Sequence, residues 1–187
     1  MNKRRTPSFQ SRKKARGFSL IEFGIVVALI AGATVIVYLM FSGRSDSATA
    51  SAEAQNFTMM AADTQQKWRA QGNFTGIAAA DLVNNGVVPA TMVVGEAIQT
   101  RWNTPVTVAQ GTVNSAGDSV VFTYQVPQRS CADFVTQAGS SAVVVVAGGA
   151  TVKDVPNGAT TMDVSALGGA CAAAEGANVP VLLTVTR

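Results

Sequence analysis

The chain has 187 residues, of which 48% are apolar and 13% are charged, a composition that excludes an intrinsically disordered protein. It has no histidine and two cysteines, so the usual general base near neutral pH and the common zinc ligand sets are missing. We therefore expect no catalytic residue, no metal site and no cofactor, although these facts alone do not exclude an enzyme that uses only carboxylates.

The net charge of +3 is concentrated at the start of the chain. Seven of the fourteen Lys and Arg residues lie within the first sixteen positions, where there is no acid, whereas the part from Phe18 onward has more acidic than basic residues. The basic cluster directly precedes an apolar run, which favours a cytoplasmic segment of a membrane protein over a nucleic-acid site.

Residues 18–41 predict a transmembrane helix. They contain one charge, Glu22, and would span roughly 36 Å at about 1.5 Å per residue, enough to cross a hydrocarbon core of about 30 Å. Tyr38, near the far end, suits a membrane interface.

The helix is expected to continue to about Ala70, since residues 44–70 contain neither Pro nor Gly and Gly72 is a plausible stop. This second half is predicted to be amphipathic. Its apolar stripe has spacings of three and four: Ala54, Phe57, Ala61, Thr64 and Trp68. Its polar side is predicted to hold Glu53, Asn56, Asp63, Gln66 and Lys67.

The rest of the chain predicts a mainly antiparallel sheet. Residues 72–100 are expected to form a loop with a brief helix from Ala79 to Asn85-Gly86. β-Branched runs predict strands at Pro105–Ala109, Ser119–Val126, Ala142–Ala147 and Val179–Thr186, with a turn at Asn114–Asp118. Ser130 is predicted to cap a short helix over Cys131–Ala138, and the Gly pairs in Ala147–Ala150 and Leu167–Ala170 are predicted to be turns. Trp102 is expected to belong to the core.

The stretch Arg16–Glu22 carries the functional signal. An acid near the centre of a transmembrane helix costs roughly 2.5–3.5 kcal/mol, and less near the end, so Glu22 implies a partner. Cleavage after Gly17 would create a cationic amine on Phe18 that could pair with Glu22 of a neighbouring chain. Such a buried pair would set the register between helices.

Gly17, Phe18 and Glu22, after a basic leader and within an apolar helix, resemble the signature of type IV pilin precursors. The resemblance implies an α+β type IV pilin fold, in which the long N-terminal helix packs on an antiparallel sheet. It also implies cleavage by prepilin peptidase, N-methylation of Phe18, and polymerisation by an assembly platform with its ATPase. The leader length and the domain are more similar to type IVb major pilins, including those of conjugative thin pili, whereas Phe18 is more typical of type IVa.

On this interpretation residues 1–17 are a cleaved leader, 18–41 the transmembrane and assembly helix, 42–71 its amphipathic continuation, and 72–187 the head domain. The precursor would cross the bacterial inner membrane once with its N-terminus in the cytoplasm, and the mature subunit would form an extracellular homopolymer. Two cysteines outside the cytoplasm favour a Cys131–Cys171 disulfide over free thiols. In type IV pilins the region between such cysteines is exposed on the fibre, so residues 132–170 are where contacts with a host or recipient cell are expected.

Four other interpretations stay open at this point. Ala48-Thr49-Ala50 offers a signal-peptidase site, although the apolar run is longer than an ordinary signal peptide has. The run could instead be a plain membrane anchor with an incidental acid. The same leader and helix also occur in type II secretion pseudopilins, and a membrane-anchored periplasmic binding domain would need neither cleavage after Gly17 nor filaments.

Overall fold

The computed structural model describes residues 20–174 and 176–187, which divide into two compact units with a boundary between Phe41 and Ser42. The helix α1 (Leu20–Trp68) contributes its first part to one unit and its second part to the other. The head unit adds the helices α2 (Ala79–Asn84), α3 (Gln128–Ala138) and α4 (Val164–Ala172), and the short 3₁₀ turns η1 (Ala90–Met92) and η2 (Gly139–Ser141).

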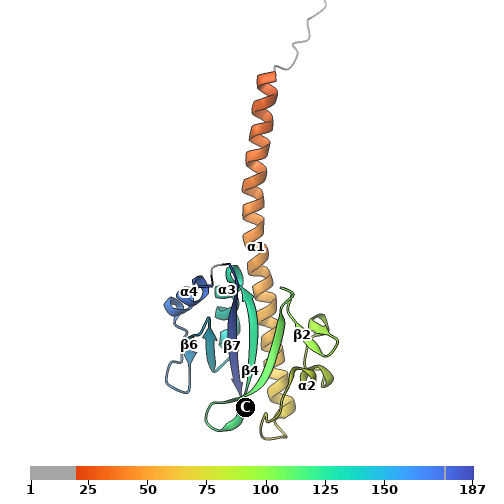
Figure 1. Cartoon of the computed structure of the whole chain (residues 1–187), viewed down its shortest axis with the longest axis vertical. Coiled ribbons are helices and arrows are strands. Elements are labelled where there is room, and N and C mark those ends of the chain that lie inside the picture. The colour runs from red at the N-terminus through yellow and green to blue at the C-terminus, as the bar shows by residue number, and fades with distance from the viewer. Residues whose placement is uncertain (1–19, 175) are drawn as a thin grey trace, which may run out of the picture. The chain divides into compact units, whose positions relative to one another are not determined.

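Seven strands of the described head form one sheet in the order β1-β2-β3-β4-β7-β5-β6, with every neighbouring pair antiparallel (Figure 1). They are β1 (Val93–Val94), β2 (Ala97–Gln99), β3 (Pro105–Thr112), β4 (Ala116–Pro127), β5 (Val144–Ala147), β6 (Ala150–Asp154) and β7 (Asn178–Thr186). The last strand in the sequence, β7, therefore lies inside the sheet, between β4 and β5.

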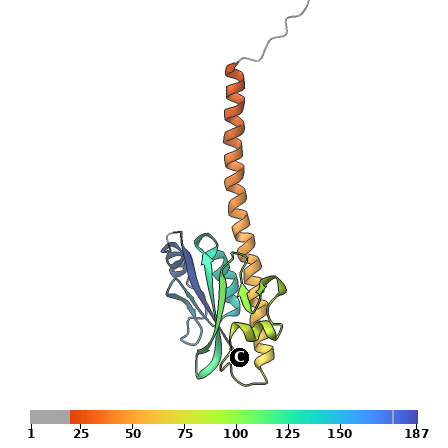
Figure 2. The same ribbon diagram turned by 45° about the vertical axis from the view of Figure 1, so that its right-hand side comes forward.

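One face of the sheet is buried, because buried and more exposed residues alternate along its central strands. Along β7, Val179, Val181, Leu183 and Val185 are buried and the residues between them are more exposed. The second part of α1 runs along this sheet in both views (Figures 1 and 2). The ring of Phe57 on α1 lies 5.5 Å from that of Phe122 and 6.1 Å from that of Tyr124, both on β4.

The predicted apolar stripe of α1 is confirmed, since every one of its five residues is buried in the core. The helix ends at Trp68, close to the predicted end at Ala70, and Gly72 follows with a φ of 77°. The predicted start at Phe18 lies outside the described residues.

Two predictions about local structure were wrong, and three strands were not predicted. Ser130 does not cap α3: the helix begins earlier, after Pro127, and the buried Ser130 hydroxyl donates instead to the Asp46 carbonyl of α1 at 3.4 Å. The stretch Leu167–Ala170 is not a turn but part of α4, because Leu167 and Ala170 are buried against the core. The strands β1, β2 and β6 were not predicted, although the Gly148-Gly149 turn that joins β6 to β5 was.

Candidate functional site

The segment Leu20–Tyr38 of α1 is long and apolar enough to cross a membrane, and none of it is buried within the described structure. Its large side chains are open to the surroundings; Leu20, for example, is 90% exposed and Ile21 76%. At about 1.5 Å per residue, its 19 residues extend roughly 28 Å, close to the thickness of a hydrocarbon core. An apolar surface of this extent requires either lipid or other protein to cover it.

Glu22 is the only charged residue of this segment and lies in the first described turn of α1, with its side chain exposed. Its predicted partners in processing and assembly, Gly17 and Phe18, lie outside the described residues. Gly24 and Gly32 lie on the same helical face, and an added Cβ at either would meet no atom within 4 Å. This face therefore allows another helix to approach closely.

In the head, Glu53 of α1 is completely buried, which corrects the prediction that Glu53 and Asn56 face solvent. One carboxylate oxygen, Oε1, accepts the Arg101 main-chain amide at 3.0 Å and lies 3.6 Å from Nε of the same residue. Burial raises the pKa of Glu53, and this effect exceeds the opposing effects of the amide and charge of Arg101. Glu53 is four residues before Phe57, so the spacing of the apolar stripe contained a signal for its burial.

Several polar atoms near Glu53 are buried without a hydrogen-bond partner among the described residues. They are Oε2 of Glu53, the amide nitrogen of Asn56 and the hydroxyl of Tyr124. Burial, and then the charge of Glu53, raise the pKa of Tyr124 well above its usual value. The contacts of Glu53 with Arg101 tie α1 to the Arg101 loop, so this cluster belongs to the framework of the head.

The loop that Glu53 holds also positions Trp102. The ring of Trp102 lies edge-on to Phe134 of α3, with 5.6 Å between the ring centroids, and packs against the core as expected. Phe134 in turn lies 5.0 Å from Tyr124 of β4. A row of aromatic rings thus joins the Arg101 loop to α3 and the sheet.

Cys131 of α3 and Cys171 of α4 form the predicted disulfide, with their Cα atoms 5.8 Å apart. The bond encloses β5, β6 and the exposed connection between β6 and α4. Within the described parts of the chain, no three His, Cys, Asp or Glu side chains are grouped so that they could hold a metal ion.

Comparison with known proteins gives one family match. The family model described as PilS N terminal matches residues 47–185, which is most of the chain and nearly all of the head. No curated protein sequence matches the chain.

Solved structures with a similar fold include two pilins. One is TcpA, a type IV pilin from Vibrio cholerae El Tor biotype, with a TM-score of 0.52 and 16% identity over 76% of this chain and 99% of that chain. The other is the type IV b pilin from Salmonella typhi, with a TM-score of 0.53 and 16% identity over 73% of this chain and 99% of that chain. Both of these proteins are pilins, and at this level of identity the likeness concerns the fold.

Proposed function

Since the chain belongs to the PilS N-terminal family and has the fold of type IV pilins, we propose that it is the major subunit of a type IVb pilus, made as a membrane-anchored precursor that is cleaved after Gly17. A type IV pilin is a structural subunit of a pilus and not an enzyme. Its identity implies self-assembly into a filament; the steps of processing and polymerisation described below are our proposal.

The observation that carries the proposal is the uncovered apolar surface of Leu20–Tyr38. Lipid covers this surface in the precursor, and the same segments of neighbouring subunits cover it in the filament. Because one apolar environment replaces another, the transfer does not expose the surface to water. Gly24 and Gly32, with Ala28 between them, allow the helices to pack closely.

Glu22 would fix the register of this helical bundle. Cleavage after Gly17 leaves a cationic amine on Phe18, which pairs with the Glu22 carboxylate of a neighbouring subunit. A subunit out of register would leave both charges unpaired in an apolar core, which is strongly unfavourable.

The proposed pathway has three kinds of partner. Prepilin peptidase cuts the precursor on the cytoplasmic face of the inner membrane and methylates Phe18, and an assembly platform with its ATPase extracts the subunit. In the extracellular filament, the exposed part of residues 132–170 contacts a host or recipient cell.

The processing step is tested by the intact mass and the N-terminal residue of the protein isolated from its native cells without reducing agent. A chain that starts at Phe18, with or without an added methyl group, is the expected result. A chain that starts near Ala50 would identify an ordinary signal peptide, and an uncut chain in cells with active prepilin peptidase would identify a plain anchor. Either result would overturn the proposed cleavage.

The pairing step is tested by Glu22→Ala, with Thr34→Ala on the same helix as a matched control. We expect Glu22→Ala to be cleaved normally but to give few filaments by electron microscopy, whereas Thr34→Ala assembles like the wild type. Wild-type filament yield from Glu22→Ala would rule out the pairing and leave the cleavage result unaffected.

A further inference from the structure

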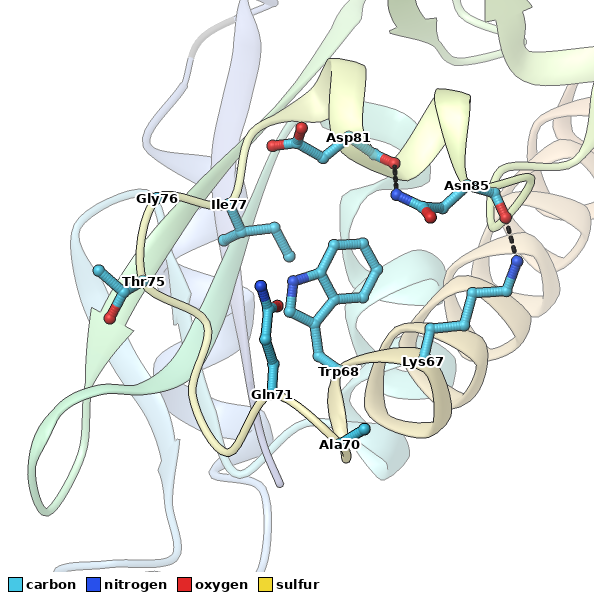
Figure 3. Close-up of a pocket in the computed structure, with 9 residues that line it drawn as sticks. All are labelled: Lys67, Trp68, Ala70, Gln71, Thr75, Gly76, Ile77, Asp81 and Asn85. Atoms are coloured by element: carbon cyan, nitrogen blue, oxygen red, sulfur yellow. Dashed lines mark hydrogen bonds between the residues drawn. The ribbon is translucent and has the colours of Figure 1, made fainter.

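A cavity of about 560 Å³ opens on the head between the C-terminal end of α1, the loop that follows it and α2 (Figure 3). Its volume falls in the range of roughly 300–1,000 Å³ that is usual for small-molecule sites. Neither the family match nor the proposed assembly assigns a role to it. Its polar walls come from Lys67, Trp68, Gln71, Thr75, Asp81 and Asn85.

Trp68 provides an unusual donor in this cavity. The residue is 8% exposed, and its indole ring stands between Gln71 and the α2 side of the cavity in Figure 3. A buried indole N–H normally has an acceptor. Nε1 of Trp68 has no hydrogen-bond partner among the described residues, and it is not among the polar atoms sealed from solvent. The donor is therefore available to a molecule in the cavity.

Three further polar groups of the wall have no partner within the described structure. They are the carboxamide of Gln71, the hydroxyl of Thr75 and Oδ1 of Asp81. Behind them the wall is held by internal bonds: Oδ2 of Asp81 accepts the Ala78 amide at 2.9 Å, and the Asn85 side chain donates to the Asp81 carbonyl at 2.7 Å. Lys67 donates to the Asn85 carbonyl. The α2 side of the wall is thus organised by bonds within the head.

The chemistry of this wall narrows the class of ligand. Lys67 and Asp81 are its only charged residues and cancel in net charge, whereas a phosphate or a nucleic acid needs a positive site. Its polar side chains are unsuited to a lipid chain. An indole N–H together with amide and carboxylate groups suits a neutral ring that carries several hydroxyls. We infer that this cavity binds a neutral saccharide.

The inference does not depend on cleavage or polymerisation and can be tested on the full-length protein. The chain has two tryptophans, Trp68 and Trp102, so its ¹⁵N-labelled form has two indole N–H signals. Trp102→Phe identifies the signal of Trp68. The protein is held in a detergent without a sugar headgroup and titrated to tens of millimolar with glucose, galactose, N-acetylglucosamine or N-acetylgalactosamine, with glycerol as the control.

We expect at least one sugar to shift the Trp68 signal in a saturable way, while the Trp102 signal stays in place and glycerol has no effect. Gln71→Ala removes a side chain with no internal bond and should weaken binding about fivefold, as expected for one hydrogen bond. Gln66→Ala, on α1 but outside the cavity, should bind like the wild type. The tetramer of N-acetylglucosamine distinguishes two sources of the saccharide. Tighter binding of the tetramer than of the monomer points to a glycan chain, and equal binding points to a free sugar.

Three results would overturn the inference: no sugar shifts the Trp68 signal, both indole signals move together, or Gln71→Ala binds as tightly as the wild type. Filament formation is not part of this readout. A negative result here would therefore leave the proposed pilus function in place, and failed assembly would leave the sugar site in place.

Discussion

The main-chain amide of Arg101 donates a 3.0 Å hydrogen bond to the buried carboxylate of Glu53, which lies 48 residues earlier in the chain. This bond fastens the loop between β2 and β3 to α1. It also holds the neighbouring Trp102 against Phe134, so a single acid on the helix organises three elements of the head.

Replacing Glu53 separates its roles as acceptor and as charge. Glu53→Ala should destabilise the head by about 1–3 kcal/mol, because the Arg101 amide loses its acceptor inside the protein. Glu53→Gln keeps an oxygen at this place and should stay within about 1 kcal/mol of the wild type. Thermal unfolding of the full-length protein in micelles, followed by near-UV circular dichroism, measures both. Equal effects of Ala and Gln would show that the hydrogen bond does not stabilise the fold.

The same acid should make the stability of the head depend on pH. Because its folded pKa is raised above the usual value of 4.5, the protonated form is favoured in the fold. The contribution of this protonation to the stability of the head is therefore complete below about pH 4.5, and it is lost as the pH rises through the folded pKa of Glu53. Melting temperatures measured upward from pH 4.5 should fall for the wild type and fall less for Glu53→Gln. Parallel curves for the two proteins would contradict this assignment.

Asp118 should give the stability of the head the opposite dependence on pH. Its carboxylate accepts the amides of Val113, Asn114 and Ser115 in the turn between β3 and β4, and these bonds lower its pKa from 3.8 to about 2. The stabilisation is present above about pH 3.8 and is lost as the pH falls toward about 2. Asp118→Asn should lose this part of the acid transition, whereas Asp63→Asn, on the exposed side of α1, should keep it. An acid titration followed by circular dichroism distinguishes the two variants.

The disulfide should contribute strongly to stability. Closing a loop of 40 residues stabilises a fold by about 4 kcal/mol in the chain-entropy model. Replacing both cysteines by alanine should lower the free energy of unfolding by about this amount, as measured by thermal unfolding. The wild-type protein after reduction is the matched control and should agree with the double variant. An unchanged melting temperature would show that the packing of α3 and α4 stabilises the head without the disulfide.

The turn between β5 and β6 offers a paired test of close packing. A Cβ at Gly148 would lie 2.8 Å from the carbonyl oxygen of Ala170, whereas one at Gly149 would meet no atom within 4 Å. Both glycines have positive φ, 54° and 84°. Gly149→Ala should therefore cost about 1 kcal/mol from backbone strain alone, and Gly148→Ala about 2–3 kcal/mol because α4 must also move. Equal losses in the free energy of unfolding would mean that α4 can shift at little cost.

Local patterns in the sequence predict much of this head. The spacing of Phe57, Ala61 and Trp68 predicts the buried face of α1, and the β-branched runs in β4 and β7 predict the central strands. The compartment indicated by the N-terminal segment predicts the disulfide. Each of these signals lies in neighbouring residues or in composition.

The features that were missed depend largely on contacts between residues far apart in the sequence. Gly168 and Gly169 disfavour a helix, but Asp163 accepts the Ala166 amide at the start of α4, and the Cys171 disulfide holds the helix near its other end. Glu53 has a local signal for burial in its spacing from Phe57, but its hydrogen bond depends on the loop at Arg101. The Trp68 cavity requires α2 to lie beside the end of α1, which no short pattern expresses.

The position of β7 has a consequence for the order in which the chain can become a folded protein. Among the strands of the described sheet this one is synthesised after the others, yet it is the only link in that sheet between the β3–β4 hairpin and the β5–β6 hairpin. Until residue 178 and those after it are available, the two hairpins cannot join, and an interrupted chain holds two incomplete halves. Synthesis of β7 thus becomes a condition for folding of the sheet, and a subunit terminated before this strand cannot present a finished head to a growing fibre.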